Sequence, residues 1–324
     1  MLKIGVLGAG HLGKIHIKLL KEIENVELIG FFDPDYVNAA LVEAQYNVKW
    51  FDNMAALIAQ TDAVVVVTPT VYHYEQAAMV MDMGKHVFIE KPMSSSISEA
   101  ARLRSLVQKH KVKLQVGHVE RFNPAFLAIK DQKINPMFIE AHRLAMFNPR
   151  GTDVSVVMDL MIHDIDLILC MVKSNVNDVR ANGVAVVSSS PDIANARIEF
   201  ENGCVANLTA SRLSLKEMRK IRLFQPDAYL SLDFLERRAE RISLTPNALP
   251  DKPSFEIRPN PASPPKYLSI DQYPPMETNA IKMELQLFVQ SIINNTPEAV
   301  TVDDGFKAVE LAHRIISQMP KQRP

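Results

Sequence analysis

This chain of 324 residues has only two cysteines and almost no excess of charge of either sign. The two cysteines, Cys170 and Cys204, lie in apolar neighbourhoods with no partner at metal-ligand spacing. This favours buried free thiols in a reducing compartment. The formal net charge is −1, which argues against a protein that binds nucleic acid or a membrane surface.

Long hydrophobic runs are also missing. The longest uncharged apolar run, "AVVVV" at 63–67, is far too short to span a bilayer. The N-terminus, "MLKIGVLGAG", starts a strand at once and has no cleavage-site pattern, so we expect a cytoplasmic protein. With 47% hydrophobic and 23% charged residues, the chain has the composition of a soluble globular protein, and its length suffices for two domains.

The first 120 residues alternate between β-branched apolar runs and amphipathic runs. Continuous apolar strands separated by helices predict a parallel sheet covered on both faces, the doubly wound Rossmann arrangement of an α/β protein. The predicted strands are 3–8, 26–33, 63–69, 86–92 and 113–118, and the helices between them include 11–23 and 96–111.

A glycine-rich pattern stands between the first predicted strand and the first predicted helix. Gly8 permits the tight turn, Gly10 lets the backbone approach a pyrophosphate, and Gly13 allows helix and strand to pack closely. About twenty residues later Asp33 ends the second strand, where its carboxylate would bind ribose hydroxyls and repel a 2′-phosphate. The pattern predicts NAD rather than NADP; the alternative is a structural glycine turn with a surface aspartate.

Two further segments end predicted strands, "TPTVYH" at 68–73 and "EKP" at 90–92. Strand C-termini border the ligand crevice of a doubly wound sheet, although Thr68 and His73 are equally plausible as cap or turn residues. The residues that we expect to bind the cofactor are Gly8, Gly10, His11, Leu12, Gly13, Asp33, Thr68, Pro69, His73, Glu90 and Lys91.

The segment "VVMDLMIHDIDLI" (156–168) is almost entirely apolar and yet carries three aspartates and a histidine. On a helix, Asp159 and His163 share a face one turn apart, and Asp166 follows one turn later. Burying a carboxylate is costly unless it is paired or used. We interpret Asp164 and Asp166 as structural; for His163 the alternative to a functional role is a hydrogen-bonded core histidine.

Four motifs in order, the glycine fingerprint, "EKP", "GHVERFNP" (117–124) and Asp-x-x-x-His, resemble the glucose–fructose oxidoreductase/inositol dehydrogenase/rhizopine-catabolism (Gfo/Idh/MocA) family over essentially the whole chain. The resemblance implies an NAD(P)-dependent sugar or polyol dehydrogenase whose second domain has a large open, mostly antiparallel sheet used in oligomer contacts. It also implies that Lys91 is catalytic and that Asp159 and His163 form an acid/base pair.

These assignments make chemical sense. Oxidation of a secondary alcohol needs hydride transfer to the nicotinamide and a base for the hydroxyl proton, which His163 can supply. Asp159 would orient His163 or bind a neighbouring hydroxyl, and Lys91 would stabilise alkoxide charge or relay the proton. No metal is expected.

The sequence around Met161 and Ile162, together with "RGTDVSVV" at 150–157, resembles the branch of this family that oxidises C3 of UDP-N-acetylglucosamine. The diphosphate of such a substrate needs cationic partners, and Arg121, Arg143 and Arg150 are available. Arginines in loops are usually solvated or ion-paired, and Glu120 or Asn123 could instead cap the helix after Pro124. The residues that we expect to contact substrate are Glu120, Arg121, Asn123 and Arg150.

Two other functions remain open. One is a dehydrogenase of a free aldose, polyol or inositol with the same catalytic set. The other is a non-catalytic, dinucleotide-sensing regulator, although a sensor has no need of Lys91, Asp159 and His163 together.

We expect an NAD-binding domain at 1–120 and a substrate and oligomerisation domain at 121–324, with a homodimer or homotetramer formed through the open sheet. Strands are predicted at 137–147, 179–188, 194–213 and 219–234, with a hairpin at Asn202-Gly203. Residues 246–275 hold nine of the twenty prolines and predict an irregular excursion over the sheet. Helices are predicted at 277–294 and 302–318.

Overall fold

The computed structural model describes residues 1–148, 154–188, 190–248, 253–258, 260–274 and 276–320. The chain divides into two compact units. Unit 1 consists of Met1–Val119 and Asn279–His313, and unit 2 consists of Glu120–Thr278 and the chain from Arg314 onward. In the described ranges, no helix is long and apolar enough to cross a membrane.

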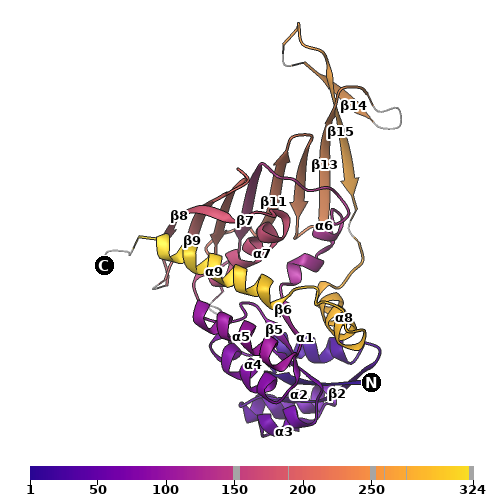
Figure 1. Cartoon of the computed structure of the whole chain (residues 1–324), viewed down its shortest axis with the longest axis vertical. Helices are drawn as coiled ribbons and strands as arrows, with labels where there is room; N and C mark the ends of the chain where they lie inside the picture. Colours follow the sequence, from indigo (N-terminus) through magenta and orange to yellow (C-terminus); the bar gives the residue numbers. More distant parts are fainter. Residues whose placement is uncertain (149–153, 189, 249–252, 259, 275, 321–324) are drawn as a thin grey trace. The chain divides into compact units, whose positions relative to one another are not determined.

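Unit 1 is built on a six-stranded, wholly parallel sheet with the order β3-β2-β1-β4-β5-β6 (Figure 1). This is the order of a Rossmann fold, and it confirms the doubly wound sheet expected from the sequence. Its strands are β1 (Leu2–Leu7), β2 (Val26–Phe32), β3 (Trp50–Phe51), β4 (Ala63–Val66), β5 (His86–Glu90) and β6 (Leu114–Gly117), and its crossover helices are α1 (His11–Leu20), α2 (Tyr36–Tyr46), α3 (Met54–Ala59), α4 (His73–Asp82) and α5 (Ile97–His110).

Two C-terminal helices, α8 (Ala280–Ile293) and most of α9 (Val302–Gln318), belong to unit 1, although the sequence-based division placed everything after residue 120 in the second domain. The reason is the apolar face of α8. Leu285 and Phe288 are fully buried and join the core beside α1 and β5, and the rings of Phe288 and Phe88 lie 5.8 Å apart. A single cut in the sequence cannot separate the two units, because α8 comes late in the chain and packs in the core of unit 1.

Unit 2 is built on a nine-stranded sheet with the order β14-β15-β13-β12-β11-β7-β10-β9-β8 (Figure 1). Among the strands that the structure describes, only β7 and β10 pair in parallel, so the open, mostly antiparallel sheet is confirmed. The strands are β7 (Phe138–Leu144), β8 (Val176–Val184), β9 (Ile193–Phe200), β10 (Val205–Ser211), β11 (Met218–Gln225), β12 (Ala228–Asp233), β13 (Arg238–Thr245), β14 (Ser254–Ile257) and β15 (Lys266–Tyr273).

The hairpin predicted at Asn202-Gly203 joins β9 and β10, and Gly203 adopts the left-handed φ of +83° that such a turn requires. The excursion predicted for 246–275 is wrong in part, because β14 and β15 are regular strands of the sheet. The prolines of this region that the structure describes lie outside both strands, so they remove no N–H donor from either of them.

The packing of α8 generates a stability prediction. Replacing the buried Phe288 by alanine removes its contact with Phe88 and should lower the free energy of unfolding by about 3–5 kcal/mol. Ile293→Ala on the exposed end of the same helix should cost less than about 1 kcal/mol. Urea denaturation of both variants tests this, and equal losses would contradict the placement of α8 in the core.

Candidate active site

The glycine turn after β1 has the geometry of a dinucleotide cradle. Gly8 has a left-handed φ of +95°, and a Cβ on Gly13 would lie 2.1 Å from the Gly8 carbonyl oxygen, so only glycine permits this approach of α1 to β1. A Cβ on Gly10 would meet nothing within 4 Å, and Gly10 caps α1. The turn therefore leaves its backbone open at a helix N-terminus, which fits a pyrophosphate.

Asp33 lies at the end of β2, directly beside this turn. Its carboxylate accepts hydrogen bonds from the backbone N–H groups of Ala9 (2.7 Å) and Asp35 (2.9 Å). Each oxygen keeps a further lone pair, so Asp33 is held in place and can still accept a ribose hydroxyl. The indole of Trp50 donates to the Asp33 carbonyl oxygen (3.3 Å), which makes the single tryptophan of the chain a reporter for this position.

The loops after β4 and β5 are tied together by His73. Its ring nitrogens lie 2.8 Å from the carbonyl oxygens of Thr68 and Pro92, and burial lowers the pKa of His73. His73 is almost fully buried, whereas Pro69 is exposed. Thr68 donates its hydroxyl to Gln76 (2.7 Å). Of the other expected cofactor residues, His11 and Leu12 begin α1 with exposed and half-buried side chains, respectively.

Glu90 and Lys91 end β5. Lys91 is half-buried, and its peptide bond to Pro92 is cis. The Glu90 carboxylate lies 2.9 Å from Nε2 of the buried His16 and accepts the backbone N–H of Lys91 (3.2 Å). Burial raises the pKa of Glu90, but the hydrogen bond and charge of His16, followed by the charge of Lys91, outweigh it and lower that pKa below its usual value. Glu90 is therefore an anion fixed behind the Lys91 backbone.

In unit 2, the apolar segment with the aspartates forms a π-helical turn, η3 (Val157–Met161), followed by α7 (Ile162–Met171). The sequence predicted one regular α-helix; π turns are rare and are frequent at functional sites. Asp159 in η3 and His163 in α7 are half-exposed, whereas Asp164 and Asp166 are buried. The two residues expected to do chemistry are thus the accessible ones.

The buried aspartates of α7 are paired with arginines. Arg143 of β7 donates to Asp164 (2.8 Å) and to Glu120 (2.8 Å) in η2 (Val119–Phe122). Burial lowers the pKa of Arg143, but the charges of Asp164 and then Glu120 outweigh it and raise that pKa. Arg121 binds Asp166 through two hydrogen bonds of 2.8 and 2.6 Å. The structural interpretation of both aspartates is borne out by these bonds.

These pairs bear on the expected substrate residues. Glu120 and Arg121 are both engaged by partners within unit 2. Asn123 accepts the N–H of Ala125 (3.0 Å) as the cap of α6 (Pro124–Leu127) and donates to Glu120 (2.9 Å). The geometry therefore favours the capping alternative for Asn123 over a substrate contact. Arg150 lies outside the described residues.

Two buried ionisable residues near Glu90 were not identified from the sequence. His16 occupies an apolar-face position of α1, and Glu284 occupies one of α8, four residues before Phe288. Both could have been found in the sequence, because each is an ionisable residue at a position where the helical pattern predicts an apolar one. The same feature drew attention to 156–168.

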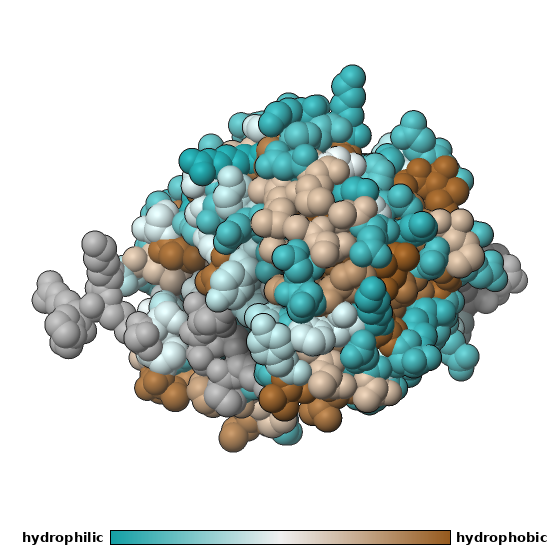
Figure 2. All heavy atoms as spheres, turned by 90° about the horizontal axis from the view of Figure 1, so that it is seen from below, coloured by the Kyte–Doolittle hydropathy of each residue, from teal (hydrophilic) through white to brown (hydrophobic). Residues whose placement is uncertain are grey.

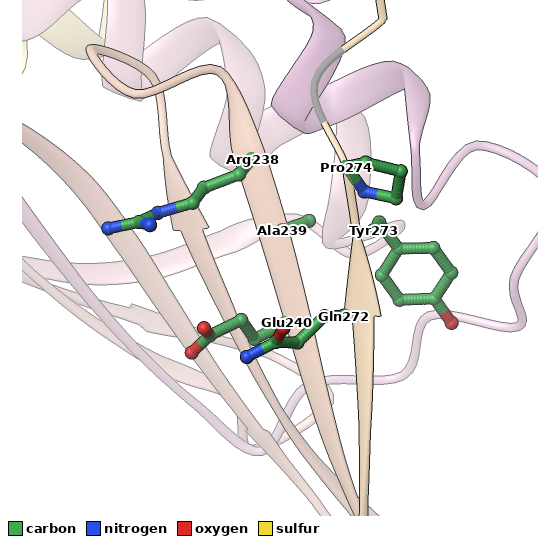
Figure 3. Close-up of a pocket in the computed structure, with 6 residues that line it drawn as sticks. All are labelled: Arg238, Ala239, Glu240, Gln272, Tyr273 and Pro274. Carbon is green, nitrogen blue, oxygen red and sulfur yellow. The ribbon is translucent and has the colours of Figure 1, made fainter.

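Other features of the described residues give no competing site. Within these residues no three His, Cys, Asp or Glu side chains are grouped to hold a metal ion. A depression of about 370 Å³ lies along β13 and β15 (Figure 3). Its lining contains none of the expected site residues; the side chains of Arg238, Glu240 and Gln272 lie on one face of the sheet and Tyr273 lies on the other.

Comparison with known proteins gives two family matches. Residues 2–118 match the oxidoreductase family with an NAD-binding Rossmann fold (Gfo/Idh/MocA), and residues 136–225 match the Gfo/Idh/MocA C-terminal domain. Together the two matches cover more than half of the chain.

Individual relatives agree with this. The chain is 41% identical over 235 residues to the UDP-N-acetylglucosamine 3-dehydrogenase of Acidithiobacillus ferrooxidans, covering 72% of this chain and 74% of that protein. A solved structure of that enzyme has a TM-score of 0.88 and 33% identity, covering 98% of this chain and 97% of that one. The NAD(+)-dependent scyllo-inositol 2-dehydrogenase of Bacillus subtilis strain 168 is 27% identical over 232 residues, or 65% of this chain and 68% of that protein.

The Arg143 network generates a second prediction. Arg143→Met leaves Glu120 and Asp164 buried without their cation, so the free energy of unfolding should fall by about 3–5 kcal/mol. Arg222→Met, which breaks the half-exposed pair with Glu140 on the neighbouring strand, should cost less than about 1 kcal/mol. Chemical denaturation measures both, and a neutral Arg143→Met would show that the network is dispensable.

Proposed function

Since the chain belongs to the Gfo/Idh/MocA family of oxidoreductases, which includes sugar and inositol dehydrogenases, we propose that it is an NAD-dependent dehydrogenase that oxidises the C3 hydroxyl of a UDP-N-acetylhexosamine. The observation that carries this substrate is the 41% identity to the UDP-N-acetylglucosamine 3-dehydrogenase of Acidithiobacillus ferrooxidans.

The proposed chemistry assigns one task to each candidate residue. NAD accepts the hydride when it is bound. His163 takes the proton of the reacting hydroxyl, Asp159 orients His163 or a neighbouring hydroxyl, and Lys91 stabilises the developing alkoxide. The half-exposure of all three side chains supports these roles, because a group that touches substrate must be reachable.

The preference for NAD over NADP rests on charge. Asp33 is held beside the glycine turn by two backbone N–H groups, and Asp35 adds a second carboxylate two residues later. Pro34 stands between them, where an NADP site would offer a cation. Two carboxylates repel a 2′-phosphate, so we propose NAD as the cofactor.

A free polyol or inositol is the second candidate substrate. It is favoured by the commitment of Arg121 and Arg143 to buried carboxylates, which leaves neither guanidinium as a ready partner for a diphosphate. The relationship to the scyllo-inositol 2-dehydrogenase of Bacillus subtilis supports the same alternative.

The function is tested by the absorbance of NADH when purified protein meets NAD or NADP and a panel of UDP-sugars, free sugars and inositols. We expect turnover with NAD and UDP-N-acetylglucosamine. His163→Ala and Lys91→Met should each lower kcat about 10²–10⁴-fold while NAD binding, followed by Trp50 fluorescence, is retained.

A protein that carries both His163→Ala and Lys91→Met should lose much less kcat than the product of the two single losses, because residues that act on one substrate act as a unit. The surface histidine variant His110→Ala, which removes a contact to Asp82, is the matched control and should keep full activity. Turnover confined to a free polyol would replace the substrate, and silence with bound NAD would favour a sensor.

We also propose that the chain forms at least a dimer through the open face of the nine-stranded sheet. Alternate side chains of β7 are buried, and the others are half-exposed. On the half-exposed face, cross-strand pairing aligns an apolar row over six strands: Val205, Phe138, Phe224, Tyr229, Ile242 and Ile270.

Adjacent rings in this row are close, 5.9 Å between Phe138 and Phe224 and 5.0 Å between Phe224 and Tyr229. Polar pairs such as Arg222–Glu140 and Lys220–Asp233 lie beside the row, which gives an apolar centre with a polar rim. For comparison, the molecular surface seen from below in Figure 2 mixes hydrophilic and hydrophobic residues. The continuous apolar row on the sheet is typical of a protein–protein interface.

Phe224→Glu puts a charge in the middle of the row and should convert the oligomer to a smaller species in analytical ultracentrifugation. Phe224 is 39% exposed, so the isolated chain tolerates the charge. Ile293→Glu, at an exposed apolar position of α8, is the control and should leave the mass unchanged. A wild-type monomer at micromolar concentration would refute the proposal.

A further inference from the structure

Three ionisable side chains cluster behind Lys91 inside unit 1. His16 and Glu284 are fully buried, and Glu90 is 8% exposed. Glu90 is held by His16 and by the Lys91 backbone. Neither carboxylate oxygen of Glu284, nor Nδ1 of His16, has a hydrogen-bond partner among the described residues. A buried carboxylate without a hydrogen bond is rare and costly, so its retention calls for an explanation.

The surroundings of Glu284 make an anion expensive there. It sits on α8, which packs on α1 and β5, and its neighbours Leu285 and Phe288 belong to the apolar core. The Gln115 side chain donates to the Glu284 backbone oxygen (2.7 Å), so it serves the helix rather than the carboxylate.

The charged groups around Glu284 come from each element that packs against α8. Helix α8 packs on α1, which carries His16, and on β5, which ends at Glu90. Glu90 is the charged group that acts on Glu284, and it binds His16 and the backbone of Lys91, the next residue in the chain. The Lys282–Glu22 pair between α8 and α1 is partly exposed and is satisfied within itself (3.0 Å). His16 is the buried basic side chain of this contact, and its Nε2 already lies 2.9 Å from the Glu90 carboxylate. Two ionised carboxylates would compete for one partner.

We propose that Glu284 is a positioning residue: it carries a proton in the native protein, leaves Glu90 as the sole buried anion of the cluster, and so sets the charge that Lys91 meets. The inference rests on the role proposed for Lys91 in the dehydrogenase. Burial, followed by the charge of Glu90, raises the pKa of Glu284 well above its usual value, in agreement with this assignment. Gly117 contributes space, because a Cβ there would lie 3.1 Å from the Glu90 carboxylate.

Proton retention has a signature in folding that needs no substrate. A Glu whose pKa is raised on folding stabilises the native state fully below the unfolded pKa of about 4.3, and this contribution declines as pH rises toward the folded pKa. Wild type should therefore lose stability relative to Glu284→Gln as pH rises from about 5 to 8.5, by up to tenfold in the folding equilibrium per pH unit.

Thermal unfolding of the full chain across this pH range measures that difference. Glu284→Leu provides the same comparison if the glutamine variant folds poorly. Glu22→Gln, the same chemical change at the partly exposed end of the α1–α8 contact, should track wild type at every pH. Parallel curves for wild type and both Glu284 variants would overturn the proton assignment.

The positioning role is tested on Lys91 itself, by acetic anhydride labelling against pH with mass spectrometry of the Lys91 peptide. When Glu284 loses its proton as pH rises, wild type gains a second negative charge in the cluster, and a neighbouring ammonium group is then harder to deprotonate and to acylate. Glu284→Gln cannot gain this charge, so its labelling midpoint should be lower, by on the order of one pH unit.

The labelling midpoint of Lys91 could be the same in Glu284→Gln as in wild type, although the two proteins differ in stability as described. Glu284 would then be a structural residue, and the proposal would be overturned. The labelling needs neither NAD nor sugar. A shifted midpoint in a protein that oxidises no substrate would therefore refute the proposed function and leave the inference about Glu284 standing.

Discussion

The pairing of buried carboxylates with buried basic side chains is the constraint on which the rest of the structure depends. In unit 2, Arg143 joins Asp164 of α7 to Glu120 of η2, and Arg121 joins Asp166 to the same short helix. In unit 1, His16 of α1 holds Glu90 at the end of β5. Each pair joins two different elements, and Asp164 and Glu90 directly adjoin the candidate catalytic residues His163 and Lys91. The cost of burying these carboxylates is therefore accompanied by a fixed position for the neighbouring side chains.

Features that depend on neighbouring residues could be predicted from the sequence. The spacing of Gly8 and Gly13 predicts a contact that the structure shows as a 2.1 Å approach of the missing Cβ to a carbonyl oxygen. Asn202-Gly203 predicts a hairpin because the turn needs a positive φ, and Gly203 supplies it. Continuous apolar runs predict parallel strands, because such strands are buried on both faces.

Features that depend on distant residues could not. Nothing near Arg143 in the sequence identifies Asp164 and Glu120 as its partners, since all three meet only after β7 and α7 pack. The return of α8 to the first core is likewise decided by the complementarity of Phe288 and Phe88, 200 residues apart. The π turn at Asp159 was missed because an apolar period cannot distinguish one inserted residue from a regular helix.

The mixture of apolar and acidic residues in 156–168 is resolved by two faces of one helical segment. Asp159 and His163 stay accessible, while Asp164 and Asp166 face inward to arginines. This division has a consequence for substrate recognition. An arginine that neutralises a buried aspartate cannot leave it for a phosphate without exposing an unpaired charge to the interior, which costs several kcal/mol. A nucleotide sugar must therefore obtain its cations from residues other than Arg121 and Arg143, and a free polyol needs none.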